Sequence, residues 1–128
     1  LDRSNIKEGL KTILTGIEKV KGGISMWIFP EGTRNKVADT FLPFHEGSFK
    51  IAQKANCLSY RLRSITVLRL RGSFSQDPQG TCVVEYGRPI YINELAPENK
   101  KQLAPYVQQI ISDTYFKNKE KYAELMAK

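Results

Sequence analysis

A short apolar run that ends at a polar turn is the feature that most constrains the fold of this chain. Residues 24–29 read Ile-Ser-Met-Trp-Ile-Phe, with Gly22 and Gly23 before them and Pro30 after them. An apolar run of this length between turn-forming residues is typical of a buried strand. We therefore expect residues 24–29 to form a short buried strand.

The turn that follows this predicted strand is suited to binding an anion. Residues 31–34 read Glu-Gly-Thr-Arg. The planar guanidinium of Arg34 can give a phosphate two charge-assisted hydrogen bonds, and Glu31 can orient that guanidinium or accept from a substrate hydroxyl. Open α/β sheets bind ligands at the C-terminal ends of their strands. The pattern predicts an anion site, and a surface turn with a local Glu31–Arg34 ion pair is the alternative.

Composition narrows the class of protein. The 128 residues are 41% hydrophobic and 26% charged, which is ordinary for a globular domain and argues against disorder. No apolar run approaches the length that spans a bilayer, and no signal peptide is visible. Cys57 and Cys82 show no disulfide or zinc spacing, which suits a reducing cytoplasm.

The charge balance favours anionic partners. The chain has 20 Lys and Arg against 13 Asp and Glu, a net charge of +7. Such an excess attracts anionic lipid headgroups, coenzyme A, acyl carrier protein or nucleic acid. The basic residues are scattered and are not interleaved with aromatic residues on one module, so we expect no nucleic acid partner.

Hydrophobic periodicity predicts the other elements. A helix should open near Asn5, where Asn5 and Glu8 resemble a capping box, and stop at Gly22-Gly23. Pro105 should either kink a helix that starts at Pro97 or open a new one. We further expect a loop over 35–47, a helix over 49–55, strands over 65–70 and 81–86, and a frayed tail over 117–128.

Several stretches of the chain resemble one enzyme family. Residues 29–34, Phe-Pro-Glu-Gly-Thr-Arg, resemble the third motif block of the glycerolipid acyltransferases, which acylate glycerol 3-phosphate and 1-acylglycerol 3-phosphate. Residues 1–3, Leu-Asp-Arg, resemble the end of that family's second block. Residues 44–52 resemble the stretch after the third block, and residues 83–90 the late strand and its Gly-x-Pro turn. The resemblance therefore extends over most of the chain.

The resemblance implies a fold and an activity. The implied fold is α/β, part of the glycerolipid acyltransferase fold, with a mixed sheet flanked by helices. Residues 1–128 would be the C-terminal portion of a single acyltransferase domain whose N-terminal part is missing. The implied reaction transfers an acyl group from acyl-CoA or acyl carrier protein to 1-acylglycerol 3-phosphate (lysophosphatidate). It gives phosphatidic acid in phospholipid biosynthesis, at the cytoplasmic face of the membrane and without a cofactor.

The same resemblance assigns roles to particular residues. Arg3 would bind the phosphate of the acceptor, and Glu31, Gly32 and Arg34 would complete the acceptor site. Thr33 would support the turn. Each of these positions carries the residue type that the family motif has there.

The chain lacks the block that performs the chemistry in this family. Family members carry an earlier His-x4-Asp block, in which His is the general base for the acceptor hydroxyl and Asp orients it. The single histidine here is His45, and the residue five positions on is Lys50. We assign no catalytic residue within the chain, and expect upstream residues to supply the pair and a membrane anchor. A catalytically inactive fragment and a basic peripheral module that binds anionic membranes are the alternatives.

One segment departs from the family pattern. Residues 58–64, Leu-Ser-Tyr-Arg-Leu-Arg-Ser, stand where the family has an apolar strand such as Pro-Ile-Val-Pro-Val-Ala-Ile. Alternate arginines at 61 and 63, and at 69 and 71, would be buried without partners in a central strand. The codons CCT ATC GTA CCG GTT GCG ATC A encode that family heptapeptide, and removing their first nucleotide yields residues 58–64. The segment is therefore either a frameshift that persists to about residue 81 or a true insertion forming an exposed basic edge strand.

Overall fold

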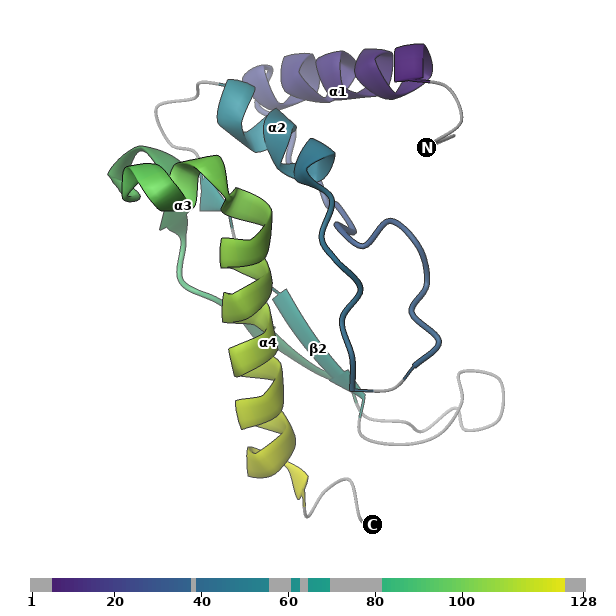
Figure 1. The fold of residues 1–128 in the computed structure, drawn as a ribbon, viewed down its shortest axis with the longest axis vertical. Helices are drawn as coiled ribbons and strands as arrows, with labels where there is room; N and C mark the ends of the chain where they lie inside the picture. The colour runs from purple at the N-terminus through teal and green to yellow at the C-terminus, as the bar shows by residue number, and fades with distance from the viewer. Residues whose placement is uncertain (1–5, 38, 56–60, 63–64, 70–81, 124–128) are drawn as a thin grey trace. The chain divides into compact units, whose positions relative to one another are not determined.

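The computed structural model describes residues 6–37, 39–55, 61–62, 65–69 and 82–123 (Figure 1). The chain forms two compact units. Unit 1 comprises Leu1–Leu62 and Ile90–Tyr106, and unit 2 comprises Arg63–Pro89 and Val107–Lys128. The sequence predicts that the chain is part of one domain. Within the chain, the structure distinguishes two units, each with internal contacts of its own.

Helix α1 spans Ile6–Lys21 and ends where the sequence predicts. Ile24 N donates to Lys19 O over 3.0 Å, and Gly23 N donates to Val20 O over 3.0 Å. This pair of bonds is the Schellman arrangement, which requires a left-handed residue after the helix. Gly23 supplies that residue with a φ of +88°, a conformation that costs glycine little.

The core of unit 1 lies between α1 and α2, which spans Glu46–Lys54 (Figure 1). Ile17, Ile51 and Ala55 are buried there, with Ile13 and Val20 packed around them. Ile13, Ile17 and Val20 recur at helical spacing and form the core-packing face of α1, whereas Leu10, at the same spacing, is exposed. Helix α2 begins three residues before the predicted position 49.

Gly16 of α1 lies beside the side chain of Ile51 in α2. A Cβ atom added at Gly16 would lie 2.7 Å from Cδ1 of Ile51 and 3.5 Å from Cε of Met26. Real Cβ atoms do not show contacts below 3.0 Å, so a side chain at position 16 would force the end of the flexible Ile51 side chain to shift.

Residues 24–29 are not a buried strand, so that prediction is wrong for this structure. They belong to no helix or strand, and Trp27 and Phe29 are 58% and 75% exposed. The apolar run favours a strand conformation, but a strand is buried only when other segments pair with it and cover its faces. Among the described residues, no strand pairs with this run.

The described strands form two antiparallel pairs. In unit 1, β1 (Arg61–Leu62) pairs with β4 (Ile90–Tyr91). In unit 2, β2 (Ile65–Arg69) pairs with β3 (Cys82–Tyr86), and Val67 lies opposite Val84. Helices and strands are both present, as the α/β prediction requires, but the described strands make two separate pairs and not one mixed sheet.

Strands β1 and β2 fall within the segment that departs from the family pattern. The strand predicted over 65–70 is confirmed at Ile65–Arg69, and the strand predicted over 81–86 is confirmed at Cys82–Tyr86. Residues 58–60, 63–64 and 70–71 lie outside the described residues. The choice between a frameshift and a true insertion therefore stays a question for the nucleotide sequence.

Three helical elements follow β4: a 3-10 turn over Ile92–Glu94, α3 over Pro97–Lys101 and α4 over Leu103–Lys121. Pro97 occupies the first turn of α3, where its missing N–H group is not needed. Pro105 lies in the first turn of α4, so it opens a new helix, one of the two predicted alternatives.

Helix α4 continues to Lys121, past Lys117, where the sequence predicts that the tail begins to fray. Asn118 is only 3% exposed, and its Nδ2 donates to Oε2 of Glu85 in β3 over 2.7 Å. This bond joins the helix to the strand pair within unit 2 and holds the last helical turns. Residues 124–128 lie outside the described residues.

The core contact predicts a large effect for Ile51→Ala. Removing a side chain that is 6% exposed should lower the free energy of unfolding by about 2–4 kcal/mol, because the substitution leaves a cavity beside Ile17. Leu10→Ala, at a site 57% exposed, is the matched control and should change it by less than about 0.5 kcal/mol. Urea unfolding followed by circular dichroism measures both, and equal effects would contradict the assigned core.

The Asn118–Glu85 bond predicts that Asn118→Ala destabilises unit 2. A buried side chain would lose a hydrogen bond to a carboxylate, which should lower the free energy of unfolding by about 1–3 kcal/mol. Gln109 of α4 bonds to Asp113 on the exposed surface, so Gln109→Ala should cost about 0.5 kcal/mol or less. Hydrogen exchange of the β3 amides should quicken in the first variant and not in the second.

Candidate functional site

The predicted anion site is a tight turn closed by its own backbone. Gly32 N donates to Phe29 O over 3.0 Å, so Pro30 and Glu31 occupy the two central positions. Proline suits the first central position, because its ring fixes φ near the value that the turn needs. Gly32 has a φ of +64°, in the left-handed region that glycine enters without strain.

A second backbone bond joins this turn to helix α2. His45 N donates to Pro30 O over 2.9 Å, so the loop from 30 to 45 closes on itself. His45 is the residue that precedes α2, and the Phe44 and Phe49 rings lie with centroids 6.3 Å apart across the start of that helix. The turn is therefore held at a fixed position relative to α2, which the core of unit 1 anchors.

A side-chain network shapes the outer part of this loop. Asn35 Oδ1 accepts from Val37 N over 2.9 Å, the Asx-turn arrangement. Asn35 Nδ2 donates to Thr40 O over 2.8 Å, and Thr40 Oγ1 donates to Val37 O over 3.0 Å. These bonds join Asn35, Val37 and Thr40 into a local structure of their own, between the turn and α2.

Four of the five predicted site residues, Glu31–Arg34, are consecutive in the sequence and lie in this turn or directly after it. Glu31 is half-buried, with its Oε2 shielded from solvent, whereas Gly32, Thr33 and Arg34 are exposed on the turn. Arg3, the fifth, lies outside the described residues. An exposed guanidinium beside this turn can reach a phosphate in solvent, while one carboxylate oxygen of Glu31 is shielded from it.

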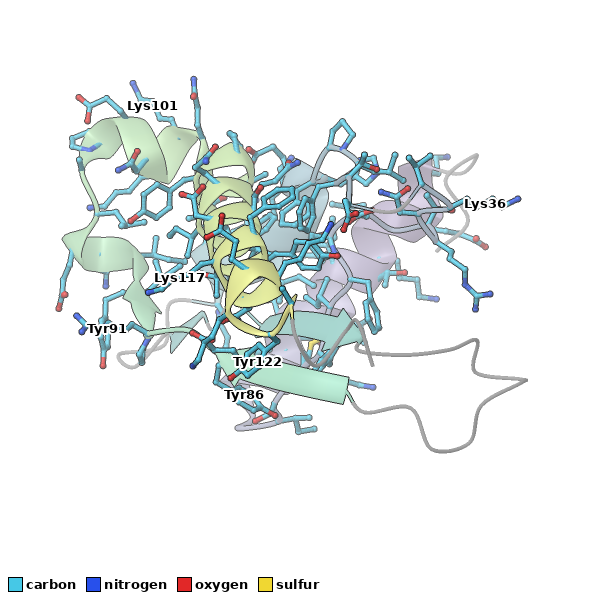
Figure 2. The ribbon with its side chains drawn as sticks, turned by 90° about the horizontal axis from the view of Figure 1, so that it is seen from below. Lys36, Tyr86, Tyr91, Lys101, Lys117 and Tyr122 are labelled. Carbon is cyan, nitrogen blue, oxygen red and sulfur yellow. The ribbon has the colours of Figure 1, made fainter. Side chains whose placement is uncertain are left out.

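A second cation follows Arg34 on the same loop. Lys36 is exposed, and Figure 2 shows its side chain extending away from the ribbon. Two cations two residues apart make this loop locally basic, which attracts an anionic ligand at low ionic strength. Sequence reasoning about the motif had not singled out Lys36.

His45 and Glu46 have structural positions that the motif does not reveal. His45 is exposed and contributes its backbone N–H to the loop closure, in keeping with a loop residue and not a base. Glu46 Oε1 accepts from Ala104 N over 3.3 Å, at the start of α4. A carboxylate stabilises the N-terminus of a helix, so Glu46 ties α2 to the first turn of α4 within unit 1.

Two further features bear on what the chain can bind. In the part of the chain that the structure describes, no three His, Cys, Asp or Glu residues gather where they could hold a metal ion. The described helices likewise include none with the length and apolar content needed to span a bilayer.

Comparison with known proteins points to one family. A family model described as Acyltransferase matches residues 1–68, which include the turn and α2. A 1-acyl-sn-glycerol-3-phosphate acyltransferase of Saccharomyces cerevisiae is 31% identical over 117 residues, and its namesake in Escherichia coli is 30% identical over 118 residues. The protein of the same name from Salmonella typhimurium is 28% identical over 118 residues.

These alignments cover most of this chain and less than half of each relative. The yeast alignment covers 89% of this chain and 39% of the relative, and the two bacterial alignments cover 87% and 45%. The relatives therefore contain long regions that have no counterpart in these 128 residues. No solved structure matches the chain.

The left-handed conformation predicts how Gly32 responds to substitution. Gly32→Ala should lower the free energy of unfolding by about 1–2 kcal/mol, because a Cβ atom at a φ of +64° meets the neighbouring carbonyl oxygen. Gly32→Asn should cost less, since asparagine tolerates this region better. Thermal unfolding of the two variants measures the difference, and an alanine variant as stable as the parent would contradict the conformation.

Proposed function

The chain belongs to the acyltransferase family, and on that basis we propose that it forms part of an O-acyltransferase that makes phosphatidic acid. The name shared by the yeast, Salmonella and Escherichia relatives supports 1-acylglycerol 3-phosphate as the acceptor. The observation that carries the proposal is the Phe29–Arg34 turn, which lies within the matched region and presents an exposed guanidinium.

In this proposal the turn binds the acceptor. Arg34 donates paired hydrogen bonds to the acceptor phosphate, and Arg3 adds a second cation. Glu31 and Gly32 complete the site, and Thr33 supports the turn. The bonds from Gly32 N to Phe29 O and from His45 N to Pro30 O support this role, because a backbone fixed in advance loses less entropy when it binds a ligand.

The reaction needs a base that this chain does not contain. The acceptor hydroxyl loses its proton to a general base as its oxygen attacks the thioester carbonyl of acyl-CoA or acyl carrier protein. The carbon–sulfur bond then breaks, and the thiol leaves with a proton. We assign the base to a His-x4-Asp pair, and no histidine of these 128 residues has aspartate five positions on.

We place the complete enzyme at the cytoplasmic face of the membrane. Its acceptor and product are lipids, and the net charge of +7 supports association with an anionic surface. Within a complete domain, we propose that the strands of this chain join one mixed sheet flanked by helices.

The absence of the catalytic pair predicts that the 128-residue chain alone transfers no acyl group. The assay follows thiol release from acyl-CoA, and from acyl carrier protein, in the presence of lysophosphatidate. The Escherichia coli relative serves as the positive control. Measurable turnover by this chain would overturn the assignment of the base to a His-x4-Asp pair.

Arg34 and Lys36 provide a matched pair of exposed cations for testing the acceptor site. Loss of a charge-assisted hydrogen-bonding pair costs about 1.5–3 kcal/mol, so Arg34→Ala should weaken binding of a short-chain lysophosphatidate roughly ten- to hundredfold. Lys36→Ala should weaken it by less than about threefold, because an exposed single charge is screened. Titration calorimetry measures both.

A ligand without the phosphate distinguishes specific phosphate binding at this site from nonspecific attraction of anions to a basic chain. Monoacylglycerol, which lacks the phosphate, should bind the parent chain and the Arg34→Ala variant equally. Equal loss of lysophosphatidate binding in the Arg34 and Lys36 variants would instead favour the alternative function, a basic module that binds anionic surfaces without a defined site.

A further inference from the structure

We propose that one side of helix α1, its outer row, is a surface that lies on an anionic membrane. The outer row consists of the exposed side chains that recur at helical spacing on this side: Lys7, Leu10, Lys11, Leu14, Glu18 and Lys21. The proposal deepens the membrane location given above and rests on it, because it names the part of the chain that contacts the lipid. It does not depend on how the acceptor phosphate is bound or on the catalytic chemistry.

Two leucines of the outer row lie outside the core of unit 1. Leu10 and Leu14 are four residues apart, so they lie one turn apart on the same side of α1, and each is more than half exposed. The side chains of α1 that pack in the core with α2 are instead Ile13, Ile17 and Val20 (Figure 1). The contact with α2 therefore leaves the two leucines to be buried against a partner.

Lysines border the two leucines. Lys7 lies one turn before Leu10, and Lys11 lies one turn before Leu14, so the outer row as a whole has three lysines and one glutamate. A lysine can lay its methylene stem along apolar surface while its ammonium group extends to a phosphate. Leucines at the level of the first acyl carbons, with ammonium groups at the level of the headgroups, suit the boundary of an anionic bilayer.

The third side of α1 differs from the outer row in both respects. This side is formed by Glu8, Thr12, Thr15 and Lys19, which are all exposed. Its side chains are polar, and its one acidic and one basic residue leave it without net charge. Apolar surface and excess positive charge therefore coincide on the outer row, and a lipid surface that attracts one side of α1 should select that row.

An anionic lipid surface fits the outer row better than a protein partner does. A second copy of this chain would bring lysines against lysines in a symmetric contact, and each copy carries a net charge of +7. An acidic protein such as acyl carrier protein matches the charge, but the proposed acceptor is itself a lipid of the bilayer. Arg3, which we assign to the acceptor phosphate, is four residues before Lys7, so the phosphate and the first turns of α1 can share the headgroup level.

The test measures flotation of the 128-residue chain with vesicles of equal parts phosphatidylglycerol and phosphatidylcholine, and with vesicles of phosphatidylcholine alone. The chain should bind the anionic vesicles at least about tenfold more tightly, because each lysine near such a surface strengthens binding about fivefold. Replacing both leucines, Leu10→Ala with Leu14→Ala, should weaken binding to the anionic vesicles at least about tenfold. That loss should persist at high salt, since salt screens charges and leaves apolar contacts in place.

Two exposed lysines in the last turn of α1 give a matched pair of variants. Lys21→Gln removes a charge from the outer row and should weaken binding to the anionic vesicles about fivefold. Lys19→Gln removes the same charge from the third side and should weaken it less than about twofold. The diameter of a helix with its side chains, about 10 Å, exceeds the screening length of about 8 Å at physiological ionic strength. Far-UV circular dichroism of each variant verifies that the helices remain folded.

Four results would overturn the proposal: no preference for anionic vesicles, a leucine double variant that binds as tightly as the parent, equal losses in the Lys19 and Lys21 variants, or leucine-dependent binding to acyl carrier protein that is tighter than binding to vesicles. The third result would assign binding to net charge alone, and the fourth would assign the outer row to an acidic protein. Since no readout uses lysophosphatidate or acyl transfer, the outer row and the acceptor site can fail separately.

Discussion

The close contact between α1 and α2 is the constraint on which the rest of unit 1 depends. Ile51 packs against α1 beside Gly16, and the core that it forms with Ile17 and Ala55 anchors α2. The start of α2 in turn holds the loop through His45 and the first turn of α4 through Glu46. The candidate site is thus positioned by a contact that contains none of its residues.

The sequence predicts those features that depend on neighbours along the chain. Gly23 ends α1, Pro105 opens α4, and alternating residues form β2 and β3, because each outcome follows from local backbone preference. The turn at Phe29–Gly32 is predictable for the same reason. Helix α2 starts earlier than predicted because apolar periodicity marks the buried side of a helix and not its first turn.

Other features leave no periodic signal. The bonds from Ala104 to Glu46 and from Asn118 to Glu85 join residues far apart in sequence, so no local pattern announces them. Asn35 did carry a signal, since asparagine commonly bonds to the backbone two residues on. The prediction of a buried strand over residues 24–29 was wrong for a different reason. The composition of this run indicates that it prefers a strand conformation, but its burial depends on segments that pair with it and cover it.

The loop between Pro30 and His45 has two parts that should tolerate changes in sequence to different degrees. Two backbone hydrogen bonds close its base, whereas Asn35, Val37 and Thr40 in its outer part bond to one another. Doubling the length of a flexible loop costs only about 0.6 kcal/mol in closure entropy. Evolution or engineering can therefore lengthen, shorten or recompose the outer part of the loop, and so alter what approaches the turn, while the two backbone bonds that close its base are kept.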